Sequence, residues 1–235
     1  MFMTRSFTLF AAGTLLTLST AWSQEAVIRK NLAERLPQLP AIEEVNKTPM
    51  AGLYEIRVNG SEIYYTDEQG NYLVQGNLID TKQRRNLTDE RIEKLTAINF
   101  DTLPIKDAFT IVRGNGKRKL AVFEDPNCGY CKRFEKDLQK VNNVTIHMFL
   151  YPILSEDSTA KSKAIWCAKD KAKAWQDWML LDVAPTSATC DTSAITRNVE
   201  FGKKFKIQGT PTLVFADGSR VPGAIDAKQV EKRLN

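Results

Sequence analysis

Between residues 42 and 80, short apolar runs alternate with turn-forming polar residues, as they do in small antiparallel sheets. The runs LYEIRV (53–58) and EIYYT (62–66) flank Asn59-Gly60-Ser61, and Asn-Gly between two such runs is a strong hairpin signal. A second turn, DEQG (67–70), leads into another apolar run. This part of the sequence therefore predicts a short meander of strands.

One helix is expected before the meander. The segment AVIRKNLAERLPQL (26–39) begins as a helix and is stopped by Pro37. Together with the meander it forms a small α+β unit, residues 24–85, which contains no cysteine and is marginal in size for an isolated domain. Either this unit packs on the rest of the chain or it pairs with a second copy of itself. The open edges of so small a sheet favour the second option, a dimerisation domain.

The pattern changes at Thr88. The segment TDERIEKLTAIN (88–99) has a hydroxyl residue at the expected N-cap and acids in its first turn, with Ile92, Leu95 and Ile98 along one side. It predicts a linker helix within residues 86–105. The alternative is a helix packed inside one continuous domain.

From residue 106 to the C-terminus, strands and helices alternate in the order typical of the α/β class. Strands are predicted in AFTIVRG (108–114), RKLAVFED (118–125), VTIHMFLYPI (144–153) and GTPTLVFADGSRVPG (209–223). Helices are predicted in CGYCKRFEKDLQKV (128–141), TAKSKAIWCAKDKAKAWQDWML (159–180), SAITRNVEFGKKF (193–205) and DAKQVEKRL (226–234).

The N-terminus has the features of a cleavable signal peptide. Arg5 precedes an apolar stretch, residues 7–21, that is too short to span a bilayer, and small residues before position 24 predict cleavage after Ser23. The alternative is an uncleaved anchor. The formal net charge of +5 over 235 residues is mild, and the basic run 117–119 follows a turn, so the sequence predicts no nucleic-acid partner.

The main candidate for a reactive site is the segment Cys128-Gly129-Tyr130-Cys131, which contains two of the four cysteines. The pair falls where a predicted strand gives way to a helix, which places Cys128 at the helix N-terminus. Unpaired N–H groups and the helix dipole favour an anion there and lower a thiol pKa from about 8.5 to roughly 3.5–7.5. Cys128 is therefore the expected nucleophile, and Cys131, one turn further in, the expected resolving thiol.

Other uses of a closely spaced cysteine pair fit less well. Structural zinc requires four Cys or His ligands, usually as two close pairs, whereas Cys167 and Cys190 are far apart in sequence and His147 is the only histidine. Haem attachment requires a histidine where Lys132 stands. His147 lies in a predicted strand and is interpreted as a packed or solvated strand residue rather than a catalytic base, which disfavours a Cys–His hydrolase. No metal and no cofactor are expected.

Cys167 and Cys190 have a different character, since one lies in a predicted helix and the other in the polar segment TSATCDTS. An exported chain with an even number of cysteines indicates an oxidising compartment, where a bridge between them persists as a structural disulfide. The alternative is two independent thiols.

These residues together resemble the thioredoxin superfamily and, within it, the DsbC-type periplasmic disulfide isomerases. The matching segments are VFEDPNCGYCKRF, AIWCAKDKAKA, VAPTSATCD and GTPTLVFADGSRVPG, which together span most of residues 106–235. The resemblance implies a C-terminal thioredoxin-like domain with a helical insertion, preceded by a small α+β dimerisation domain and a linker helix. The N-terminal region resembles the family less sharply.

The resemblance also implies a substrate-binding surface. Gly209-Thr210-Pro211-Thr212 is similar to the cis-proline loop of the family, with Thr210 and Pro211 beside the cysteine pair, where an extended substrate could contact Gly129 and Tyr130 as well. Thioredoxins carry a buried Asp at the position of Val122 in this chain. DsbC-type proteins also lack this Asp. Glu124 is interpreted either as a partial substitute in proton handling or as an exposed acid at a strand end.

The expected function is that of a homodimeric protein disulfide isomerase in the periplasm, acting on misfolded exported proteins with disulfides. The resemblance implies a membrane-bound reductase of the DsbD kind as its partner and chaperone activity in addition. The alternatives are a thiol oxidant of the DsbA kind, a DsbG-like isomerase with fewer substrates, and a holdase whose cysteines matter little.

Overall fold

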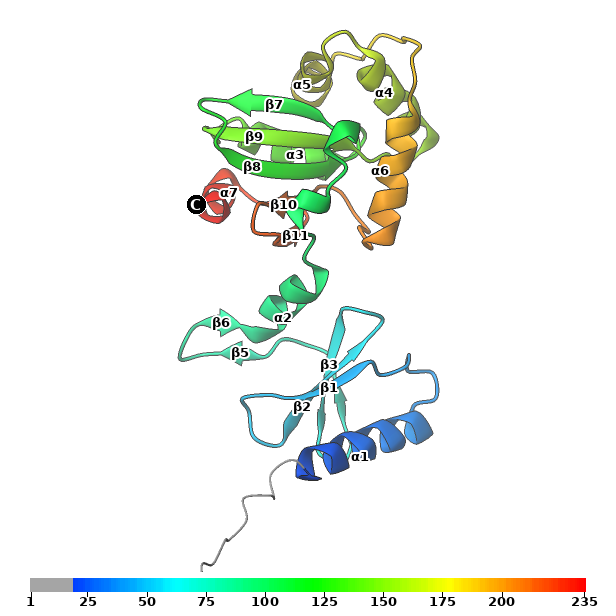
Figure 1. Cartoon of the computed structure of the whole chain (residues 1–235), viewed down its shortest axis with the longest axis vertical. Coiled ribbons are helices and arrows are strands. Elements are labelled where there is room, and N and C mark those ends of the chain that lie inside the picture. Colours follow the sequence, from blue (N-terminus) through cyan, green and yellow to red (C-terminus); the bar gives the residue numbers. More distant parts are fainter. Residues whose placement is uncertain (1–18) are drawn as a thin grey trace, which may run out of the picture. The chain divides into compact units, whose positions relative to one another are not determined.

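The computed structural model describes residues 19–235 (Figure 1). Of the expected signal peptide, residues 1–18 lie outside the described residues, and the rest falls in the first helix, α1 (Ser19–Arg35). Contacts divide the chain into two compact units, one ending at Ile92 and one beginning at Glu93. Within residues 19–235, no helix combines the length and the apolar character needed to cross a bilayer.

The N-terminal unit contains the predicted meander as a four-stranded antiparallel sheet in the order β1-β2-β3-β4. The predicted hairpin joins β2 to β3, and its turn residues Asn59 and Gly60 have φ angles of 48° and 84°, as a tight hairpin turn requires. The strands are β1 (Glu44–Lys47), β2 (Leu53–Val58), β3 (Glu62–Asp67) and β4 (Leu73–Val74).

Helix α1 covers one face of this sheet and ends before Pro37, as predicted, although it begins seven positions earlier than the predicted start at residue 26. Ile28 and Leu32 of the helix are buried against Tyr54 and Ile56 of β2. These contacts form the small core of the unit.

The segment that follows corrects one prediction. A second small sheet, β5 (Ile79–Asp80) and β6 (Arg85–Asn86), leads into α2 (Leu87–Thr96), which spans the division between the units. Thr88 is not the N-cap of this helix, because the Asn86 side chain accepts hydrogen bonds from the backbone N–H of Thr88 at 3.1 Å and of Asp89 at 3.2 Å. The Thr88 hydroxyl is buried instead, bonded to the Tyr65 hydroxyl.

The C-terminal unit is built on a five-stranded sheet in the order β11-β10-β8-β9-β7, in which only β8 and β9 run parallel. The strands are β7 (Phe109–Arg113), β8 (Arg118–Glu124), β9 (Val144–Leu150), β10 (Thr212–Phe215) and β11 (Arg220–Pro222). The helices are η1 (Phe100–Thr102), η2 (Ile105–Asp107), α3 (Gly129–Leu138), α4 (Glu156–Cys167), α5 (Lys171–Leu181), α6 (Ser193–Lys204) and α7 (Ala227–Leu234).

The central strands of this sheet are buried on both faces, and β8 shows the alternation. Leu120 and Val122 belong to the core under α3, α5 and α7, whereas Ala121 and Phe123 belong to the core on the other face, beside α6. Figure 1 shows the sheet with α3 and α6 on different sides of it. Because successive side chains of a strand point to opposite faces, Glu124 is in phase with Val122 and points toward α3.

The prediction of a single helix over residues 159–180 is wrong. Two helices, α4 and α5, are separated at Ala168, whose backbone is extended, and Asp170 caps α5 by accepting a hydrogen bond from the Lys173 N–H at 2.9 Å. In an unbroken helix, Ile165 and Trp175 would point about 80° apart. On either side of the break, both residues are buried in the same core, where each is 0% exposed.

Candidate active site

Cys128 occupies the N-cap position of α3, at the junction between β8 and the helix. Its backbone is extended, and its sulfur accepts a hydrogen bond from the Cys131 N–H at 3.3 Å. Ser, Thr and Asp side chains play this role at most helix N-termini, and here a sulfur atom takes their place. The position favours a negative charge on that sulfur, because the first N–H groups of a helix have no partner within the helix.

The two cysteines of the junction are both free thiols, and their ionisation differs sharply. Interactions with the Cys131 thiol, with the Thr210 side chain and with the backbone of Cys131 and Tyr130 lower the pKa of Cys128 to about 6, against the opposing effect of burial. Burial raises the pKa of Cys131, which is 0% exposed, and the hydrogen bond to Cys128 and the neighbouring Glu124 carboxyl group raise it further. Near neutral pH the pair therefore carries one thiolate and one thiol.

The loop before β10 lies against this pair. The Thr210–Pro211 peptide bond is cis, and the Cys128 sulfur lies 3.3 Å from the Thr210 carbonyl oxygen. Gly129 and Tyr130 form the first turn of α3, where Tyr130 is 67% exposed and the space around Gly129 is open. The structure thus brings Cys128, Cys131 and Thr210 together, with Gly129 and Tyr130 at the surface of the same junction.

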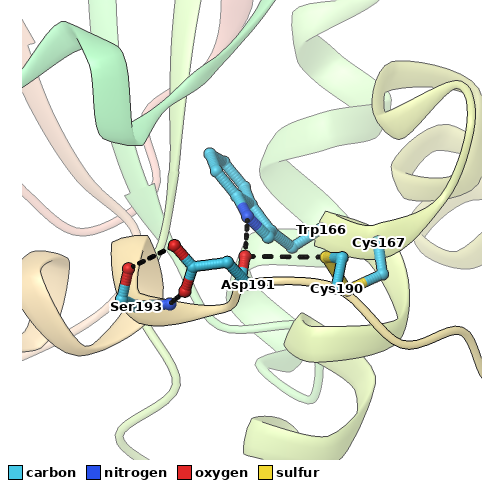
Figure 2. Close-up of a disulfide and its surroundings, with 5 residues drawn as sticks. All are labelled: Trp166, Cys167, Cys190, Asp191 and Ser193. Carbon is cyan, nitrogen blue, oxygen red and sulfur yellow. Dashed lines mark hydrogen bonds between the residues drawn. A yellow bond between two sulfur atoms is a disulfide. The ribbon is translucent and has the colours of Figure 1, made fainter.

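Cys167 and Cys190 form a disulfide that joins the end of α4 to the loop before α6 (Figure 2). The Trp166 indole N–H next to this bond donates to the carbonyl oxygen of Asp191 at 3.0 Å. The Asp191 carboxylate in turn accepts from the backbone N–H of Ser193 at 2.9 Å. The disulfide therefore holds the loop from which α6 begins.

Glu124 is not the exposed acid at a strand end that the sequence allowed. It is 0% exposed, and so is Glu135 of α3, a residue that sequence reasoning did not single out. A signal for both was present, because Glu124 is in phase with Val122 and Glu135 follows Cys131 by one helical turn. Among the residues described, no three His, Cys, Asp or Glu side chains are grouped so as to hold a metal ion.

Asp125 was also missed. Its buried carboxylate accepts hydrogen bonds from the backbone N–H of Asn127 at 2.8 Å, of Ile153 at 2.8 Å and of Leu154 at 3.0 Å. The group ties the loop before Cys128 to the segment after β9. Its role depends on contacts between segments distant in sequence, so no local pattern pointed to it.

Comparison with known proteins agrees with this arrangement. Residues 105–235 match the family model of a thioredoxin-like domain, and residues 19–89 match that of the disulfide bond isomerase protein N-terminal domain. A crystal structure of a disulfide interchange protein from Neisseria gonorrhoeae is similar, with a TM-score of 0.53 and 40% identity, covering 55% of this chain and 94% of that chain.

Curated relatives extend the similarity to nearly the whole chain. The probable thiol:disulfide interchange protein DsbC of Bordetella pertussis is 42% identical over 211 residues, which cover 90% of this chain and 74% of the relative. The thiol:disulfide interchange protein DsbC of Escherichia coli is 30% identical over 243 residues, which cover 99% of this chain and 96% of the relative. The protein therefore belongs to the DsbC family of thiol:disulfide interchange proteins, which are disulfide oxidoreductases and isomerases.

Proposed function

We propose that Cys128 is the attacking thiolate of a disulfide isomerase. The thiolate attacks one sulfur of a wrong disulfide in a substrate, so that a Cys128–substrate bond forms and the substrate bond breaks, releasing a substrate thiolate that takes up a proton. A second substrate thiolate then attacks the mixed disulfide and expels Cys128. The observation that carries this assignment is the pKa of Cys128, about 6, at the N-cap of α3.

Cys131 acts when this exchange stalls. Its thiol loses a proton and attacks the Cys128 sulfur of the mixed disulfide, which forms the Cys128–Cys131 bond and releases the substrate as a thiolate. The substrate is then reduced and the enzyme pair is oxidised. A return to the active state requires two electrons, for which we propose a membrane-bound reductase of the DsbD kind.

The substrate contacts the surface around the reactive sulfur. We assign Gly129 and Tyr130 to one side of it and Thr210 and Pro211 to the other. The exposed ring of Tyr130 offers apolar contact to an unfolded segment, and the backbone next to the cis-proline offers an edge along which an extended chain can pair. Cys167 and Cys190 serve only as a structural disulfide.

Two copies of the chain associate through the N-terminal domain, which we place at residues 24–85, before a linker at 86–105 and a catalytic domain at 106–235. Strands β1 and β4 are the edges of its sheet. Val74 on β4 and the preceding Tyr72 expose 51% and 73% of their surface, so large apolar side chains are exposed at this open edge.

The protein works in the periplasm after removal of residues 1–23. A persistent structural disulfide fits an oxidising compartment. Its substrates are misfolded exported proteins with disulfides, and two catalytic units in one dimer also provide chaperone activity by holding exposed apolar segments.

The test is recovery of activity from scrambled ribonuclease in a weakly reducing buffer with residues 24–235. We expect recovery that disappears in Cys128→Ala and persists in part in Cys131→Ala. Rapid oxidation of reduced ribonuclease without recovery of the scrambled form would instead identify an oxidant of the DsbA kind. Protection of substrates from aggregation, unchanged in Cys128→Ala and without any exchange, would identify a holdase.

A further inference from the structure

The loop that leads to Cys128 is held by contacts with other parts of the C-terminal unit. Residues 125–127 connect β8 to α3, and both Asp125 and Pro126 are buried. The Asp125 carboxylate binds the segment after β9, as described above. The two residues directly before Cys128 have partners of their own on α4 and α5, and the reaction steps above do not use these partners.

Trp178 of α5 binds the backbone of this loop. Its indole N–H donates a hydrogen bond to the Pro126 carbonyl oxygen at 2.6 Å, although the two residues are 52 positions apart. A proline has no N–H, so its carbonyl is the only backbone polar group through which it can be held. Because a buried carbonyl without a partner costs free energy, the indole both satisfies this group and fixes the peptide that follows it.

Two lysines hold the indole ring in turn. The Nζ atoms of Lys132 on α3 and Lys161 on α4 lie 4.1 Å and 4.6 Å from the centroid of the Trp178 ring, within the range of cation–π attraction. Only 25% and 22% of the two lysine side chains is exposed. Since α5 also packs against both α3 and α4, the ring joins three helices beside the loop.

Acids balance the charges of the two lysines. Lys132 pairs with Asp182 at the C-terminal end of α5, and Lys161 pairs with Asp157 of α4. These contacts lower the pKa of both carboxyl groups, so both acids are charged near neutral pH. Two ammonium groups at one ring would otherwise repel each other. The pairs therefore keep both lysines at the Trp178 ring.

Asp157 also connects α4 to the loop. Its carboxylate accepts a hydrogen bond from the Asn127 side-chain amide at 2.7 Å and another from Lys161. The Asn127 amide also donates to the hydroxyl of Ser155, the N-cap of α4, at 3.3 Å. The two residues that precede Cys128 are thus bound to α5 and to α4, respectively.

We propose that Trp178 is a positioning residue for the exchange reaction, which holds Cys128 at the N-terminus of α3 through the Pro126 carbonyl. The inference rests on the proposed role of Cys128 as the attacking thiolate. Its sulfur accepts a hydrogen bond from the Cys131 N–H at 3.3 Å and is stabilised as an anion only while it faces the first N–H groups of the helix. A looser loop lets the sulfur leave this position for part of the time, and the thiolate then loses part of its stabilisation.

Trp178→Phe tests the hydrogen bond, because phenylalanine keeps an aromatic ring beside the two lysines and has no N–H. The midpoint of Cys128 alkylation by iodoacetamide should rise by about half a pH unit from the wild-type value near 6, the effect of one weak hydrogen bond. Because a stabilised thiolate favours the reduced pair, the equilibrium with glutathione near neutral pH should shift about threefold toward the Cys128–Cys131 disulfide. A tryptophan with a purely structural role would change Tm and leave both quantities unaltered.

Trp166→Phe is the matched control. The Trp166 indole N–H also donates to a carbonyl oxygen, that of Asp191 at 3.0 Å, and the Nζ atom of Lys171 lies 5.1 Å from its ring centroid. This hydrogen bond lies beside the structural disulfide and not at the loop before Cys128 (Figure 2). The control variant loses the same kind of contact, and its alkylation midpoint should stay near 6.

Asp157→Ala tests the second contact at an exposed position, so the test does not depend on the folding of a variant at the half-buried Trp178. The removal of a negative charge by itself favours a nearby thiolate and would lower the alkylation midpoint. The loss of the Asn127 contact loosens the loop and should instead raise the midpoint. The direction of the shift therefore separates positioning of the loop from a simple effect of charge.

The outcomes of the alkylation experiments are distinct. A raised midpoint in both Trp178→Phe and Asp157→Ala, with no shift in Trp166→Phe, supports the inference. An unchanged midpoint in Trp178→Phe, an equal shift in Trp166→Phe, or an unchanged or lowered midpoint in Asp157→Ala overturns it. A wild-type midpoint near 8.5 would instead overturn the proposed role of Cys128.

Discussion

The sulfur of Cys128 lies 3.3 Å from the carbonyl oxygen of Thr210, although 82 positions separate the two residues. Their contact follows from the sheet, since β8, which leads to Cys128, pairs with β10, which follows the loop of Thr210, with Phe123 opposite Thr212. A helix N-terminus on one side and this loop on the other surround one reactive sulfur. The reactivity of Cys128 therefore depends on both elements.

The first prediction concerns the pH dependence of that reactivity. Alkylation of the reduced wild-type enzyme by iodoacetamide should rise with pH to half its maximum near pH 6, because the pKa of Cys128 is about 6 and the pKa of Cys131 is raised. Peptide mapping should find the label at Cys128 alone between pH 6 and 8. A midpoint near 8.5, the value of an ordinary thiol, would contradict the assignment of Cys128 as nucleophile.

The lowered pKa of Cys128 also predicts how the stability of the reduced protein varies with pH. Folding lowers the pKa of Cys128, so the thiolate stabilises the folded state fully above about pH 8.5. This contribution is lost as pH falls through about 6. The difference in Tm between reduced wild type and Cys128→Ser should therefore grow from pH 6 to 8.5, as followed by thermal unfolding. A difference that does not change over this range would show that the thiolate is not stabilised in the folded state.

Thr210→Val tests the contribution of the loop. The substitution keeps the shape of the side chain and removes the hydroxyl that helps to lower the pKa of Cys128. Alkylation of Cys128 at about pH 6 should slow roughly threefold, the effect of one weak hydrogen bond. Thr212→Val is the control, because its hydroxyl bonds to the Gly209 carbonyl at 2.7 Å and has no part in the ionisation of Cys128. An equal effect of both variants would mean that the loop acts through its shape alone.

The cysteine site could be predicted from sequence because its signals are local. The order of strand, Cys128, one turn of helix and Cys131 appears in consecutive residues, and the tight turn at Asn59 and Gly60 is equally local. The size of each thiol pKa shift could not be predicted from sequence, because it depends on burial and on neighbours distant in sequence.

The features that could not be predicted depend on tertiary packing. The phase of Glu124 with Val122 indicates only which side of β8 it lies on, and its complete burial depends on packing around the end of the strand. The break between α4 and α5 is marked by the extended backbone at Ala168 and by the Asp170 cap, and the continuous helical pattern of the sequence does not reveal it. Thr88 does not cap α2 because its hydroxyl is bonded to the hydroxyl of Tyr65, which lies on β3 of the N-terminal sheet.

The disulfide should contribute to stability and leave the chemistry of Cys128 unaltered. It closes a loop between positions 23 apart, for which the loop-entropy model gives about 3 kcal/mol. The variant Cys167→Ala/Cys190→Ala should unfold about 10 °C lower. Its alkylation profile should keep its midpoint near pH 6. Differential scanning calorimetry measures the first quantity, and a shifted midpoint would show that the bridge shapes the active site.

The last prediction concerns the edge of the N-terminal sheet. Strand β4 pairs only with β3 among the described strands, and Val74 on it is 51% exposed. A lysine at an open edge hinders pairing with another chain, so Val74→Lys should turn a dimer of residues 24–235 into a monomer in sedimentation velocity. Val112→Lys is the matched control, since Val112 is 62% exposed on β7, an edge strand of the other sheet, and should leave the dimer intact.

Each outcome of the sedimentation experiment leads to a different conclusion. A wild type that sediments as a monomer refutes the proposed dimer. A Val74→Lys variant that remains a dimer places the association at another surface, and dissociation by Val112→Lys would place it on the C-terminal unit. If Val74→Lys is monomeric and keeps its Cys128 ionisation, the ribonuclease assay on that variant measures how much isomerisation depends on two catalytic units acting on one substrate.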